Sequence, residues 1–185
     1  YNNTGKVCYP VPEDSDFVFS GQALKHPLLP YHQAVGNNLH FEGRPKVLTI
    51  TGANMAGKST FLRTLATNLL LAMNGAPVCA LSLRFHPCDL RSSINIRDSL
   101  AQNESYFYAE LKRLKSIVAH VEKQPNTLVV LDEILRGTNS MDKHKGSYEL
   151  LEKFLSLKAV VVIATHDLGI GELARNYPGL AENHC

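Results

Sequence analysis

The 185-residue sequence contains no tryptophan, four scattered cysteines and almost no excess of either charge. Lysine and arginine together number 19, and aspartate and glutamate 17, so the formal net charge is +2. An excess this small does not by itself indicate binding to nucleic acid. Apolar residues make up 44% and charged residues 19% of the chain, which excludes a disordered tail, a collagen-like fibre and a disulfide-rich toxin.

The cysteines form no Cys-x-x-Cys pair, and Cys79 lies in an apolar run that is typical of a core segment. This pattern favours reduced thiols in an intracellular, cytoplasmic protein, with a zinc site or a disulfide as the alternatives. His86 and Cys88 lie close in the sequence, but two potential ligands do not make a metal site.

The sequence also lacks an uninterrupted hydrophobic run long enough to span a membrane. Its most apolar stretch, 65–83, is broken by Asn68, Asn74, Gly75 and Pro77, which fits a helix, a turn and a strand better. We therefore expect no membrane contact from this chain. Because the sequence starts without a methionine and stops soon after a strand, we expect a fragment that is truncated at its C-terminus.

Apolar strands alternate with amphipathic helices from residue 46 onwards. The expected strands are 46–51, 78–83, 127–131 and 159–164, and the expected helices are 60–73, 103–121 and 141–157. Leu111 is expected on the apolar stripe of the second helix, and 84–102 show no clear pattern. Continuous apolar strands alternating with helices indicate an α/β fold, in which helices cover both faces of a mostly parallel sheet.

Residues 1–45 are rich in proline, glycine and asparagine and only weakly periodic. We expect an irregular lead-in with short strands, belonging to the same domain as the core at 46–185.

A phosphate-binding motif stands between the first strand and the first helix of this core. Residues 52–59 match the pattern G-x-x-x-x-G-K-[ST] in full. In such a loop, backbone N–H groups and the N-terminus of the following helix point at phosphate oxygens. Lys58 is expected to contact the β- and γ-phosphates, and the Ser59 hydroxyl to bind Mg²⁺. The remaining ATP-binding residues of the motif are Gly52, Ala53, Asn54, Met55, Ala56 and Gly57.

Two carboxylates follow the apolar strand 127–131. Asp132 is expected to hold Mg²⁺, directly or through water, and Glu133 to take a proton from the attacking water. The alternative is an acidic pair at the start of a helix. His166, after the strand 159–164, is expected to contact the γ-phosphate or orient water, although a lone histidine is more often structural.

Five segments, in order, resemble the MutS family of mismatch-repair proteins. They are His26-Pro27, which matches a His-Pro ahead of the family core; 51–60, which resemble TGPNMGGKST; 105–110, which resemble STFxxE; 132–140, which are similar to DEIGRGTST; and 164–166, which match ATH. Because all five appear in sequence over roughly residues 24–185, the chain is identified as a divergent member of this family.

The resemblance implies a P-loop ATPase of the ABC/MutS type that works as a dimer with composite sites. Ser105 would begin a helix facing the γ-phosphate held by the partner subunit, whereas the residues alone favour Ser105 capping its own helix. Thr60 would complete the ATP-binding loop. The segment at the dimer interface would comprise Arg136, Gly137, Thr138, Asn139 and Ser140.

Several positions depart from the family pattern. Ala53 and Ala56 replace proline and glycine in the phosphate loop, and both are small enough for binding to survive. Ala34 stands where the family has an aromatic that packs on adenine. Either Val35 and neighbours such as Asn37 cover the base, or base selectivity is looser.

Two functions follow from these features. The first is hydrolysis of Mg-ATP by a homodimer, coupled to DNA binding by other domains of the parent protein. The second is a nucleotide-gated dimerisation module with little or no hydrolysis, which changes in the signature segment motivate: Asn103 stands where the family has glycine, and Tyr106 replaces threonine. DNA binding rests on the resemblance alone, because a solvated helix face explains the basic cluster of Lys112, Arg113 and Lys115.

Overall fold

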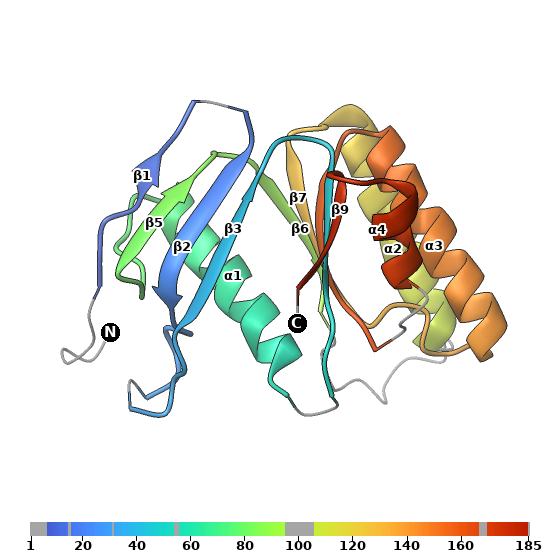
Figure 1. Cartoon of the computed structure of the whole chain (residues 1–185), viewed down its shortest axis with the longest axis horizontal. Helices are drawn as coiled ribbons and strands as arrows, with labels where there is room; N and C mark the ends of the chain where they lie inside the picture. The colour runs from blue at the N-terminus through green and yellow to red at the C-terminus, as the bar shows by residue number, and fades with distance from the viewer. Residues whose placement is uncertain are drawn as a thin grey trace. The chain divides into compact units, whose positions relative to one another are not determined.

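The structure, a computed structural model, describes residues 7–14, 16–30, 32–53, 56–94, 106–166 and 170–184. The chain divides into two compact units. One unit comprises Tyr1–Arg44 and Ser59–Cys88, and the other comprises Pro45–Lys58 and Asp89–Cys185. Figure 1 labels the helices and strands of both units.

The second unit contains a parallel sheet with the strand order β6-β7-β8-β4-β9. The strands are β4 (Lys46–Ile50), β6 (Asp89–Ser93), β7 (Thr127–Asp132), β8 (Val160–Ala164) and β9 (Ala181–His184). Every residue of β4, β7 and β8 is buried. Such continuous apolar runs are typical of the interior of a parallel sheet, so the predicted α/β fold is confirmed.

Three helices of this unit lie side by side on one face of the sheet (Figure 1). They are α2 (Tyr106–Lys123), α3 (Ser140–Ser156) and α4 (Gly171–Asn176). Val129, Val161 and Ile163 share a hydrophobic cluster with residues of these helices, among them Leu114, Ile117, Leu151, Phe154 and Leu173. Side chains alternate between the two faces of a strand, and this cluster therefore belongs to one face.

The first unit contains a four-stranded sheet, in the order β1-β5-β2-β3, together with most of helix α1 (Lys58–Met73). The strands are β1 (Val11–Pro12), β2 (Val18–Leu24), β3 (Asn37–Glu42) and β5 (Ser82–Phe85). Strand β2 pairs antiparallel with both β3 and β5. Phe41 stacks on Phe19, with ring centroids 5.5 Å apart, and on Phe17 at 6.2 Å, so three aromatic rings form the centre of this core.

The strand expected at 78–83 lies further along the chain, at Ser82–Phe85, and shares only residues 82 and 83 with the expected range. Val78 forms only an isolated bridge with Cys8, and the regular strand, β5, begins at Ser82. Hydrogen bonds of Cys79 divert the intervening backbone: its N–H donates to Asn68 Oδ1 and its carbonyl accepts from Lys25 N–H. The ladder with β2 therefore starts only at Ser82.

Other differences concern elements whose partners are distant in sequence. Strand β6 lies in the segment 84–102, where its polar sequence DLRSS gave no signal. Helix α4 and strand β9 were not expected. Leu114 and Val121 of the predicted α2 stripe are buried and Phe107 and Val118 pack against the same cluster, whereas Leu111 is 41% exposed and Ile117, which was not predicted, is buried. The predicted lead-in, 1–45, contains β1, β2 and β3.

No helix of the described ranges is long and apolar enough to cross a membrane. Within the same ranges, no group of three or more histidine, cysteine or acidic side chains could hold a metal ion.

Asn68, on α1, is the central buried polar group of the first unit. Its side-chain Nδ2 donates to the carbonyls of Lys25 and Thr64, at 3.0 and 2.9 Å, and its Oδ1 accepts from Cys79 N–H at 2.9 Å. The side chain is fully buried. It thus joins the helix to the end of β2 and to the turn before β5.

Replacing Asn68 with leucine should lower the free energy of unfolding by about 1–3 kcal/mol, because buried backbone groups lose their partners. Asn74→Leu is the matched control, since Asn74 is exposed and its amide donates only to Leu70 O. Urea unfolding of both variants measures the difference. Equal losses in the two variants would contradict the role of Asn68.

Candidate functional site

The phosphate motif follows β4 and leads into α1. Its backbone turns sharply: Gly57 has φ +88°, a conformation that L side chains rarely adopt, and Ala56 N–H donates to Ala53 O at 3.2 Å. Lys58, the first residue of α1, is 9% exposed and donates from Nζ to Gly52 O at 2.7 Å and Ala53 O at 3.0 Å. The lysine ammonium therefore lies inside the loop. The predicted Asn54 and Met55 lie outside the described residues.

Strand register brings three predicted segments to one edge of the sheet. Ile50 of β4 pairs with Ala164 of β8, and Ala164 pairs with Asp132 of β7. Two hydrogen bonds extend this pairing past the strand ends, from Thr165 N–H to Ile50 O at 3.1 Å and from Glu133 N–H to Ala164 O at 2.9 Å. Carboxyl ends of parallel strands are where ligands bind in α/β folds.

Asp132 ends β7 with a carboxylate that is only 5% exposed. Its Oδ1 is buried and has no hydrogen-bond partner among the described residues. A buried carboxylate oxygen without a partner is unfavourable, and a cation would remove that penalty. The residues present therefore fit a divalent ion at this edge, in agreement with the preference of Mg²⁺ for carboxylate oxygen.

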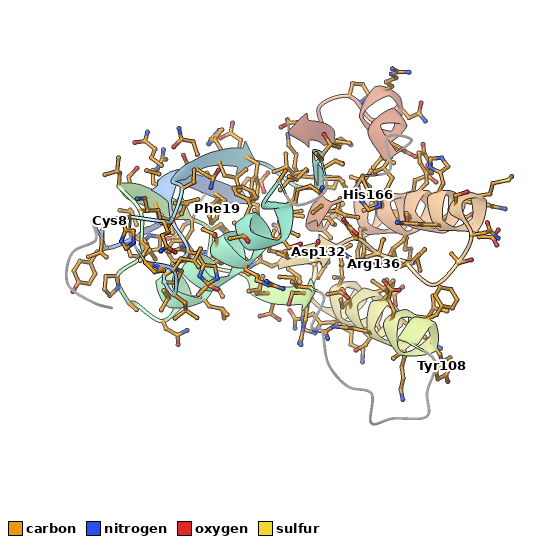
Figure 2. All side chains as sticks on the ribbon, turned by 90° about the horizontal axis from the view of Figure 1, so that it is seen from below. Cys8, Phe19, Tyr108, Asp132, Arg136 and His166 are labelled. Atoms are coloured by element: carbon orange, nitrogen blue, oxygen red, sulfur yellow. The ribbon has the colours of Figure 1, made fainter. Side chains whose placement is uncertain are left out.

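Glu133 is held at both carboxylate oxygens. His166 Nδ1 lies 3.0 Å from Oε1, and Arg136 Nη2 lies 2.8 Å from Oε2. Arg136 also donates from Nε to the backbone carbonyl of Glu133 at 3.0 Å. Figure 2 shows Asp132, Arg136 and His166 gathered at the same edge. The sequence anticipated Glu133 and His166 here, but it missed the pairing with Arg136, for which the i, i+3 spacing was the available signal.

The loop after Glu133 is anchored on α2. Leu135 N–H donates to Glu110 Oε1 at 2.7 Å, and a Cβ on Gly137 would lie 2.7 Å from Phe107 Cβ. Leu135 is buried with φ +58°, a left-handed conformation, although the family pattern quoted above has glycine at this position. Glu110 is the glutamate of the segment that resembles STFxxE, but sequence reasoning gave it no role of its own. Its position one helical turn after Phe107 places both on the face of α2 that contacts the loop.

Asn139 has a local role at the start of α3. Its backbone is extended, with φ −66° and ψ 162°, and its Oδ1 accepts from Asp142 N–H at 2.9 Å. This is the geometry of a helix N-cap. Thr138 and Ser140, the other residues of the predicted interface segment, flank this cap.

The remaining residues that the sequence predicted for the site lie in the first unit or outside the described residues. Ser59 and Thr60 continue α1 directly after Lys58, within the first unit. In the same unit, Val35 is 78% exposed, and Asn37 donates from its side chain to Val35 O at 3.2 Å. Ser105 lies outside the described residues.

The structure also describes His26, from the His-Pro segment, and Arg113, from the basic cluster. In the first unit, burial lowers the pKa of His26, and the nearby charge of Arg63 acts in the same direction. In the second unit, Arg113 of the basic cluster donates to Ser92 O from Nε at 3.1 Å and from Nη2 at 2.9 Å. At least one member of that cluster therefore supports the edge strand β6.

Replacing Asn139 with alanine should lower the free energy of unfolding by about 1 kcal/mol, because the cap of α3 is lost. Asn139→Ser keeps an acceptor oxygen and should stay close to wild type. Thermal unfolding of both variants compares them. A serine variant as unstable as the alanine variant would contradict the capping role.

Comparison with known families gives one domain match: the profile of MutS domain V matches residues 48–185. Among curated proteins, the DNA mismatch repair protein MutS of Chlorobium phaeovibrioides is 34% identical over 163 residues, which is 84% of this chain and 18% of that protein. The DNA mismatch repair protein MSH4 of Arabidopsis thaliana is 32% identical over 165 residues, which is 88% of this chain and 21% of that protein.

A third relative, MutS of Leptospira interrogans, is 33% identical over 160 residues, which is 82% of this chain and 19% of that protein. The chain thus spans about one fifth of the length of these relatives.

Proposed function

Since the chain belongs to the MutS family, as its C-terminal ATPase domain V, we propose that it binds Mg-ATP and hydrolyses it. One observation carries the proposal. Asp132 ends β7 and Glu133 follows it, at the same edge of the sheet as the phosphate loop after β4, and His166 follows β8, the strand between them.

The loop Gly52–Ser59 and Thr60 are proposed to bind the nucleotide. Lys58 donates to two loop carbonyls, and the phosphates of ATP would provide stronger, charged acceptors for the same ammonium. Val35 and Asn37 are proposed to cover the base in place of the aromatic that Ala34 replaces. This part of the proposal rests on the family resemblance.

Mg²⁺ would be held by Asp132, whose buried Oδ1 lacks a partner among the described residues, and by the Ser59 hydroxyl of the motif. When bound, the ion neutralises charge on the phosphate oxygens. The Asp132 side chain is already buried, and its Oδ1 would not have to break a hydrogen bond to any described residue in order to bind the ion.

Glu133 is proposed to accept the proton of the attacking water at its carboxylate. His166 Nδ1 contacts Oε1 and so limits rotation of the carboxylate. General-base catalysis requires the base within hydrogen-bond reach of the water, and a carboxylate with few orientations satisfies this more often than a free one.

The whole protein is proposed to act as a homodimer with composite sites. Ser105 and the segment Arg136–Ser140 would face the partner subunit, as the family resemblance implies. ATP turnover would be coupled to DNA through other domains, a proposal motivated by the mismatch-repair names of the relatives.

The alternative function is a nucleotide-gated dimerisation module with little hydrolysis. Leu135 favours it, because a buried left-handed leucine leaves the loop less free to change conformation than glycine would. Nucleotide-dependent dimerisation without turnover would distinguish this module from an ATPase.

Glu133→Gln should retain ATP binding and lower turnover at least about 100-fold, because general bases contribute roughly 10²–10⁴-fold. Glu149→Gln is the matched control, because Glu149 is exposed on α3 and its contact with Lys145 Nζ is long, at 4.0 Å. Phosphate release and ATP binding are measured in parallel on the natural protein. Unchanged turnover in Glu133→Gln would contradict the assignment of Glu133 as the general base.

Asp132→Asn should leave the ligand-free protein as stable as wild type or more stable, because a buried carboxylate whose Oδ1 has no partner among the described residues becomes a neutral amide. The same change should abolish the extra thermal stabilisation that Mg²⁺ adds to ATP. Thermal unfolding with ATP, with and without EDTA, tests both expectations. A variant that keeps the full Mg²⁺ effect would exclude Asp132 as a ligand.

A further inference from the structure

Arg136 makes two hydrogen bonds to one residue of its own chain. Its Nη2 lies 2.8 Å from Glu133 Oε2, and its Nε donates to Glu133 O at 3.0 Å. The guanidinium is planar and its donors are fixed relative to one another, so the side chain and the backbone of Glu133 are tied to each other. Arg136 is about one-third exposed, which leaves this contact partly shielded from water.

Glu133 needs such support because its backbone is left-handed, with φ +49°. A residue other than glycine in this region is strained by roughly 1–3 kcal/mol and persists only when its surroundings hold it. Its N–H is bound to Ala164 O, its carbonyl to Arg136 Nε, and its two carboxylate oxygens to His166 and Arg136. Of these contacts, Arg136 alone reaches both the main chain and the carboxylate.

Arg136 is itself held on both sides. The preceding residue, Leu135, donates its N–H to Glu110 of α2, and the following residue, Gly137, packs against Phe107 of the same helix. The backbone of Arg136 therefore lies between two anchors on α2. Its guanidinium reaches back to Glu133 from a fixed position and is not a freely mobile surface side chain.

From this geometry we infer that Arg136 is a positioning residue for Glu133, acting within its own subunit. It holds the carboxylate in the direction needed to meet the attacking water, and its effect on turnover passes through Glu133. The inference rests on the proposed function and gives Arg136 a task within its own subunit in addition to the interface position proposed above.

The test is steady-state ATP hydrolysis by the natural protein at several protein concentrations. Arg136→Ala should lower kcat about 10–100-fold, the size of effect that follows misplacement of a catalytic group by about 1 Å. KM for ATP should change less than about threefold, since Arg136 bonds to Glu133 and not to the phosphate loop. Arg175→Ala, at an exposed arginine of α4, is the matched control and should match wild type.

Three further measurements separate positioning from a purely structural role. Guanidinium ion at millimolar concentration should restore part of the lost kcat in Arg136→Ala and leave Arg175→Ala unchanged. In a Glu133→Gln background, Arg136→Ala should cause no further loss, because its target is already disabled. Arg136→Lys preserves the charge, and should remain at least about 10-fold below wild type because one ammonium cannot reproduce the fork.

The outcomes are distinguishable. Absence of turnover in the wild type contradicts the proposed ATPase. Turnover that survives Glu133→Gln contradicts the role of Glu133 as general base, and the inference with it. Turnover that is lost in Glu133→Gln but retained in both Arg136 variants overturns the inference alone. A loss that disappears as protein concentration rises, or that appears only in KM, assigns Arg136 to the dimer interface or to nucleotide binding instead.

Discussion

The register of three parallel strands is the constraint on which the site in the second unit depends. Ile50, Ala164 and Asp132 occupy one row across β4, β8 and β7. These strands are buried along their whole length, so a backbone group left unpaired by a shifted register would have no water to replace its partner. The complete ladder therefore holds the phosphate loop, His166 and Glu133 at a common edge of the sheet. The proposed hydrolysis of ATP depends on that placement.

The segment from Glu133 to Asn139 joins this edge to the helices. Glu133 and Leu135 are both left-handed residues other than glycine, a costly combination within three residues. Glu110 and Phe107 on α2 offset the strain from one side, and the Asn139 cap of α3 ends the segment on the other. A substitution in the first turns of α2 or α3 would therefore shift the position of the Glu133 carboxylate.

Leu135 is where this chain differs most informatively from the family pattern. Glycine adopts a left-handed backbone at little cost, whereas leucine does so here while burying its side chain. A Cβ on Gly146 of α3 would lie 2.8 Å from Leu135 Cδ1, so the missing side chain at Gly146 provides room for the leucine. The two positions are complementary, and the loop has become part of the hydrophobic core.

The sequence by itself determined the phosphate motif, the buried strands β4, β7 and β8, most of each long helix and the family. These features depend on local periodicity and on residue spacing along the chain. Only the tertiary structure decided the edge strands β6 and β9, whose short sequences pair because a neighbouring strand offers a ladder. It also decided the contacts between Glu133 and His166, 33 residues apart, and between Glu110 and Leu135, 25 residues apart. Strand order and helix packing set such distances, and no local pattern of residues encodes them.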